Sequence, residues 1–96
     1  MQIKTMNKKI RESKTDMKYV LGELRLKLDH HLRKIGDDTY AFVSCYNVKI
    51  HSDFLIPDDD IKEIEEKFLV ELNFYEVTYS PENNIIDTWY YFDYGK

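Results

Sequence analysis

The spacing of the apolar residues changes along this chain, and that change limits the folds it can form. Between residues 17 and 35 the apolar positions are three or four apart, which places them on one face of a helix: Met17, Val20, Leu21, Leu24, Leu28, Leu32 and Ile35. Gly36 follows directly and is expected to end this helix in the left-handed conformation. We therefore predict a helix over residues 17–35.

The next segment, residues 39–50, shows the alternation that is typical of a β-strand. We predict one continuous strand here, with one face formed by Tyr40, Phe42, Tyr46, Val48 and Ile50. A second helix is predicted to begin at Pro57, because proline fits a first helical position. Its single apolar stripe consists of Ile61, Ile64, Phe68 and Leu72.

Two more strands are predicted near the C-terminus, over residues 73–80 and 85–94, with a turn at 81–84 between them. The order α-β-α-β-β predicts a single small α+β domain over residues 1–96. We expect a three-stranded mixed sheet with a C-terminal hairpin and with the helices packed on one face. Residues 1–16 are expected to form a helical extension or an arm, because Ile3 and Ile10 continue the apolar row of the first helix.

The composition excludes several classes of protein. With 43% hydrophobic and 15% aromatic residues, the chain is too apolar to be disordered. A single cysteine excludes an internal disulfide framework and a cysteine-rich zinc module. There is no apolar run of transmembrane length and no secretory signal, so we expect a cytoplasmic protein that does not enter membranes.

Charge is distributed unevenly along the chain. Residues 1–36 hold ten basic and four acidic side chains, a net charge of +6, whereas residues 37–96 hold four basic and fourteen acidic ones, a net charge of −10. Such asymmetry is typical of a protein that binds a charged partner, or of two halves that bind each other.

The segment PDDDIKEIEEKF concentrates the negative charge at residues 57–68. Carboxylates in the first turn of a helix stabilise its positive end, so a solvated helix explains Asp58, Asp59 and Asp60. Glu63, Glu65 and Glu66 lie away from the apolar stripe. A calcium loop that begins at Asp58 is disfavoured, because such a loop needs glycine at its sixth position and Glu63 occupies that position here. A metal-dependent nuclease would need Asp58, Glu65 and Lys67 to converge on one metal ion. This site is disfavoured because all three residues fall within one predicted helix.

Other chemistry-bearing residues give weaker signals. A metal site that joins His30 or His31 to His51 and Asp53 is an alternative, but surface and boundary histidines are the favoured interpretation. The chain has no nucleophile elbow and no glycine-rich phosphate loop. We therefore expect no enzymatic activity, no metal and no cofactor.

The last predicted strand carries an unusual surface. Trp89 and Tyr91 alternate with the expected core residues, which places them on the open face of the sheet between Asp87 and Asp93. Exposed tryptophan and tyrosine are common anchors of protein interfaces. The alternative is that these rings shield a small sheet or are covered by the N-terminal segment.

These features favour a non-enzymatic inhibitor or modulator that binds a basic, nucleic-acid-binding enzyme by mimicking nucleic acid. Small acidic proteins of this kind include phage or mobile-element inhibitors of host defence, such as anti-CRISPR proteins, and toxin-immunity proteins. The expected partner-binding residues are Asp58, Asp59, Asp60, Glu63, Glu66, Asp87, Trp89, Tyr91 and Asp93.

The alternative function is a nucleic-acid-binding regulatory homodimer that uses the basic N-terminal helix. Basic residues spaced by seven would form a stripe along that helix that could follow phosphates. The stripe consists of Lys4, Arg11, Lys18 and Arg25, and Lys8 lies near it.

Overall fold

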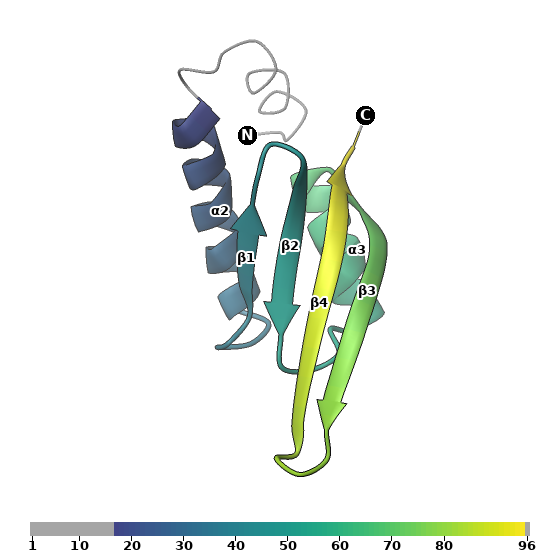
Figure 1. Ribbon diagram of the computed structural model, residues 1–96. Coiled ribbons are helices and arrows are strands. Elements are labelled where there is room, and N and C mark those ends of the chain that lie inside the picture. The colour runs from purple at the N-terminus through teal and green to yellow at the C-terminus, as the bar shows by residue number, and fades with distance from the viewer. Residues whose placement is uncertain (1–16, 96) are drawn as a thin grey trace.

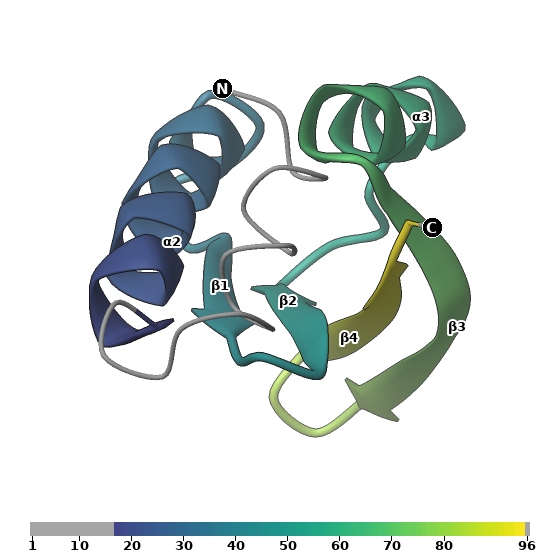
Figure 2. The same cartoon turned by 90° about the horizontal axis from the view of Figure 1, so that it is seen from above.

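The computed structural model describes residues 17–95, so the N-terminal extension predicted for residues 1–16 lies outside the described residues. The protein is an α+β domain whose elements are α2 (Met17–Arg33), β1 (Tyr40–Val43), β2 (Asn47–Ser52), α3 (Asp58–Phe68), β3 (Val70–Ser80) and β4 (Ile85–Tyr94). The four strands form one sheet in the order β1-β2-β4-β3. Figures 1 and 2 show both helices on the same side of this sheet.

Helix α2 buries the apolar face that its sequence predicts. Leu24, Leu28 and Leu32 are fully buried, and Val20 joins the same core. The left-handed role predicted for Gly36 is wrong, because no glycine in the described residues has a positive φ. A Cβ atom at this position would instead lie 2.5 Å from the ring of Phe54. Neither helix in residues 17–95 is both long and apolar enough to cross a membrane.

The prediction of one strand over residues 39–50 is wrong, because a tight turn divides this segment into β1 and β2. The Ser44 hydroxyl accepts hydrogen bonds from the backbone N–H groups of Tyr46 and Asn47, both at 3.2 Å. The Tyr94 hydroxyl donates to the Ser44 carbonyl and ties the turn to β4. These side-chain bonds stabilise a turn inside an apolar run that contains neither glycine nor proline.

The turn also reverses the predicted facing of β1. Val43 pairs with Val48, so each even-numbered residue of β1 lies opposite an odd-numbered residue of β2. Residues that pair directly across an antiparallel ladder share one face. Tyr40 and Phe42 therefore lie on the face away from the helices, and Ala41 lies in the core.

The sheet has four strands and is antiparallel throughout, which corrects the predicted three-stranded mixed sheet. The predicted C-terminal hairpin is confirmed, since β3 pairs with β4 from Val70↔Tyr94 to Ser80↔Ile85. Strand β4 also pairs with β2 along its other edge, so it separates β2 from β3. The central position suits β4 because Tyr90 and Phe92 are buried beneath the helices.

Helix α3 closes the core over the sheet. Ile61, Ile64 and Phe68 form its buried stripe, and Asp58, Asp59 and Asp60 occupy its first turn as predicted. The predicted fourth member of the stripe, Leu72, belongs instead to β3, because α3 ends at a left-handed Leu69. The loop before the helix is fixed by the Ile56 N–H, which donates to the buried Tyr90 hydroxyl at 2.9 Å.

A buried histidine, His31, lies where α2 meets α3. Its ring packs edge-on against Phe68 at 5.6 Å between centroids, and its Nδ1 lies 3.4 Å from Lys67 Nζ. Only 6% of the surface of the His31 residue is exposed. Burial, and then the positive charge of Lys67, lowers the pKa of His31 below its ordinary value of 6.5. Folding therefore favours the neutral ring.

We expect this histidine to destabilise the protein in mild acid. The unfolded chain binds a proton below about pH 6.5 while the folded chain does not, so the free energy of unfolding falls as pH decreases from 6.5 to the lower folded-state pKa. Urea denaturation at about pH 7.5 and about pH 5.5 measures this loss. The loss should shrink in His31→Leu and persist in the control His30→Leu, since His30 is exposed. Equal losses in wild type and His31→Leu would contradict the assignment.

Candidate functional site

The candidate site is the face of the sheet that the helices leave uncovered, here called the open face. The register places four residues in one row across all four strands: Tyr40, His51, Trp89 and Glu76. A second row consists of Phe42, Lys49, Tyr91 and Phe74. The sequence prediction that Trp89 and Tyr91 lie on this face agrees with the buried Thr88, Tyr90 and Phe92 that alternate with them.

The rings of the first row contact one another and also Phe42 of the second row. Trp89 lies 4.8 Å from the His51 ring and 5.8 Å from the Phe42 ring, and Tyr40 stacks on His51 at 4.9 Å. The His51 Nε2 atom lies 2.8 Å from Asp87 Oδ1, which holds the imidazole in place. Such contacts restrict ring motion, so little conformational entropy is lost when a partner binds.

The second row continues the aromatic surface to the edge strand β3. Phe74 stacks on Tyr91 at 4.4 Å, and Lys49 Nζ lies 5.8 Å from the centre of the Tyr91 ring. Trp89 and Tyr91 are half-buried by these neighbours, whereas Tyr40, Phe42 and Phe74 are exposed. Tyr40, Phe42 and Trp89 contact one another, and Phe74 contacts Tyr91. Together these five rings, here called the ring cluster, form an apolar surface of the kind that anchors protein interfaces.

Carboxylates surround the ring cluster on the side of β3 and β4. Glu71, Glu76, Asp87 and Asp93 are all exposed there. Glu71 lies directly opposite Asp93 in the ladder, and within residues 17–95 neither has a cation within 4.0 Å. Like charges opposed in this way destabilise a sheet. A cation supplied by a partner would relieve that repulsion.

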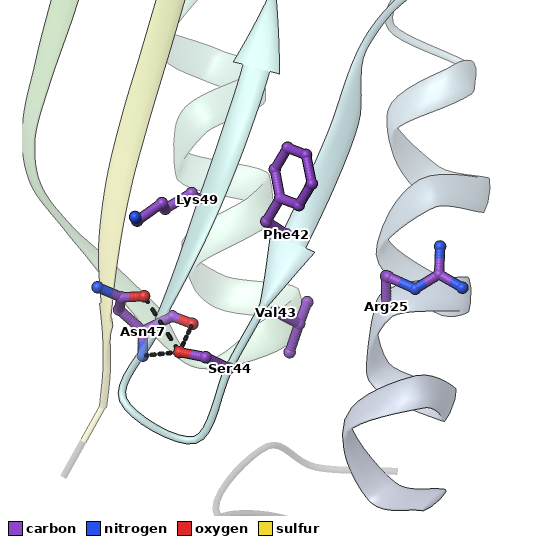
Figure 3. A pocket seen from close by; sticks show the side chains of 6 residues that line it. All are labelled: Arg25, Phe42, Val43, Ser44, Asn47 and Lys49. Carbon is purple, nitrogen blue, oxygen red and sulfur yellow. Dashed lines mark hydrogen bonds between the residues drawn. The ribbon is translucent and has the colours of Figure 1, made fainter. Parts of the chain in front are cut away.

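A shallow hollow of about 220 Å³ lies at the opposite margin of the open face. Figure 3 shows Phe42 and Val43 on β1, Lys49 and Asn47 on β2, and Arg25 on the neighbouring helix α2. Its two cations make this margin basic, although Arg25 also contacts Asp29 at 3.3 Å. The open face is thus acidic along β3 and β4 and basic beside β1.

The structure divides the predicted partner-binding residues into two groups. Asp87, Trp89, Tyr91 and Asp93 lie together on the open face. The helix α3 group lies on the other side of the sheet, where α3 packs: Asp58, Asp59, Asp60, Glu63 and Glu66. A flat partner surface can therefore contact one group or the other, but not both.

The basic stripe of the alternative function is only partly described. Lys18 and Arg25 are exposed on α2, whereas Lys4, Lys8 and Arg11 lie outside the described residues. The alternative metal site is not assembled, because His31 lies between the helices and His51 lies on the open face. Among residues 17–95, no three His, Cys, Asp or Glu side chains are grouped to hold a metal.

Three exposed members of the ring cluster were not identified from the sequence: Tyr40, Phe42 and Phe74. The signal for Phe74 is its alternation with Tyr75 in the predicted strand 73–80. For Tyr40 and Phe42, only the hairpin turn at Ser44 reveals the correct face. No protein-family model, curated protein or solved structure matches this chain. Its function is therefore inferred from the open face itself.

Proposed function

We propose that this protein is a non-enzymatic binding module that docks its open face onto a cationic surface of a partner protein. The observation that carries the proposal is the ring cluster, whose residues come from β1, β4 and β3 and are not covered by either helix. Pre-arranged aromatic rings with polar residues around them provide affinity at the centre of an interface and orientation at its rim.

The opposed pair Glu71 and Asp93 supports a cationic partner. Both side chains are exposed, and their repulsion persists in the free protein. A lysine or arginine placed between them gains attraction to two carboxylates, so the partner relieves a cost that is already present. Nucleic acid would bring further negative charge to this margin, which makes it a less suitable ligand for the open face.

We propose further that the partner is a basic, nucleic-acid-binding enzyme and that this protein inhibits or modulates it. Carboxylates around a ring cluster offer negative charge and flat aromatic surfaces, which are the features that such enzymes recognise in nucleic acid. Inhibitors of host defence encoded by phages or mobile elements, anti-CRISPR proteins among them, and toxin-immunity proteins are the classes that this chemistry fits.

The proposal is tested by recovering a partner from the native host with the full chain as bait and purifying it for affinity measurements. The complex is expected to weaken as salt concentration rises, because charge pairs at its rim are screened. Added polyanion should compete for the partner. Direct binding of this protein to DNA or RNA, lost when Lys18 and Arg25 become glutamate, would instead support the alternative function of the basic helix.

Asp93→Lys is expected to move stability and binding in opposite directions. The new lysine would face Glu71, so the free energy of unfolding should rise by about 0.2–1 kcal/mol while affinity for the partner falls. Denaturant unfolding and equilibrium binding measure the two quantities. Glu66→Lys, a matched charge reversal on α3, should leave affinity unchanged. Loss of affinity in Glu66→Lys alone would transfer the binding surface to α3 and reject the open face.

A further inference from the structure

Strand β3 is an unusually long free edge. It has 11 residues and, among the residues that the structure describes, pairs only with β4, so its outer backbone N–H and C=O groups face away from the sheet. The other edge strand, β1, has 4 residues and lies against α2. Figure 1 shows the β3–β4 hairpin extending past the end of α3. Unpaired edges of this length are templates for pairing with another strand.

Only the first part of this edge carries a feature that hinders pairing. A bulge interrupts the ladder between Leu72 and Phe74, and bulges turn an edge away from further strands. From Phe74 to Ser80 the register is regular. This section contains no proline and no lysine, and Glu76 is its only charged residue.

The same section presents an apolar row on the helix side of the sheet. Tyr75, Val77 and Tyr79 pair with Tyr90, Thr88 and Ile86 of β4, which places all three on that side. They are 55%, 46% and 56% exposed, because α3 does not cover this part of the hairpin. An exposed apolar row beside a free edge favours a strand that brings apolar residues of its own.

A second copy of β3 supplies such a strand. When two copies of β3 pair antiparallel about a two-fold axis at Val77, Val77 of one copy lies opposite Val77 of the other. Tyr75 of each copy then lies opposite Tyr79 of the other. Glu76 then lies opposite Thr78, so no like charges oppose each other. A pair centred on Glu76 would oppose two carboxylates, and one centred on Tyr75 would include the bulge. The Val77 register alone overlaps the whole regular section from Phe74 to Ser80.

We propose that the protein forms a homodimer in which two β3 strands pair antiparallel about Val77, joining the two sheets into one. The two-fold axis is perpendicular to the sheet, so both open faces lie on the same side and both helix layers lie on the other. A dimer of this kind presents two ring clusters to a partner. It does not depend on what the open face binds.

Light scattering and sedimentation of the full chain, over a wide range of concentrations, test the dimer. The mass should rise from that of one 11.6 kDa chain to twice that value. Val77→Lys should remain monomeric, because two lysines would meet at the axis, and it should still fold since Val77 is half-exposed. A wild-type chain that stays monomeric up to its solubility limit overturns the proposal.

Opposite substitutions at Thr78 test the register. In Thr78→Glu, the new carboxylate of each copy would lie opposite Glu76 of the other copy, so two repulsive pairs would form and the dimer dissociation constant should rise on the order of ten-fold. In Thr78→Lys, two attractive pairs would form and the dissociation constant should fall by a similar factor. Circular dichroism of each variant checks that the fold is kept. If the variants at Val77 and Thr78 dimerise as strongly as wild type, the copies meet elsewhere and the proposal is wrong.

Discussion

Replacing Phe92 with alanine is expected to lower the free energy of unfolding by about 3–5 kcal/mol. Phe92 is fully buried in the central strand, with Val48 on one side of it in the ladder and Leu72 on the other. The smaller side chain would lose apolar burial and leave a cavity beneath both helices. A domain of this size is stable by only about 5–15 kcal/mol, so the variant should lose a large part of its stability.

Urea denaturation followed by circular dichroism measures this loss, and Phe74→Ala is the matched control. Phe74 lies on the open face and is half-exposed, so removing its ring mainly loses the stack on Tyr91. That contact contributes about 0.5–1.5 kcal/mol. Equal losses at the two positions would mean that the core does not lie between the helices and the sheet.

Replacing Trp89 with alanine is expected to weaken partner binding by at least about 2 kcal/mol, roughly thirty-fold. Trp89 contacts Phe42 and His51 and lies at the centre of the ring cluster. Its removal deletes the largest anchor and also frees its neighbours to move, so both contact area and pre-organisation are lost. Equilibrium affinity for the purified partner is the quantity to measure.

The control for this experiment is Tyr19→Ala. Tyr19 is 75% exposed on α2, away from the open face, so its loss removes a ring without touching the ring cluster. Its affinity should match wild type. Trp89→Ala should still fold, because its side chain lies outside the core, and thermal unfolding verifies this. Unchanged affinity in a folded Trp89→Ala protein would exclude the open face as the docking surface.

Local periodicity was sufficient to predict several elements. The residues of α2 repeat every three or four positions, and the predicted strand 85–94 coincides with β4 (Ile85–Tyr94). In β4 the alternation also predicts which side chains face the helices, because Tyr90 and Phe92 are apolar at consecutive core positions. The same alternation assigns Trp89 and Tyr91 to the opposite side of the strand, which is the open face.

Alternation alone was not sufficient for residues 39–50. Apolar residues occur on both sides of this segment, so a continuous strand and a tight hairpin have nearly the same pattern. The Ser44 hydroxyl decides between them by accepting hydrogen bonds from two backbone N–H groups, and Tyr94 contributes from 50 residues away. Tyr40 and Phe42 reach the ring cluster only because of that turn.

Local sequence patterns predict the type of most elements, most of the apolar faces of the two helices and the two faces of β4, because those properties depend on neighbours a few residues apart. Three features follow from the packed fold and not from any local pattern: β4 lies between β2 and β3, the acidic residues of α3 lie on the other side of the sheet from the carboxylates of the open face, and β3 forms an edge of the sheet. Strand order depends on hydrogen bonds between segments far apart in the chain, and a local pattern contains no information about them.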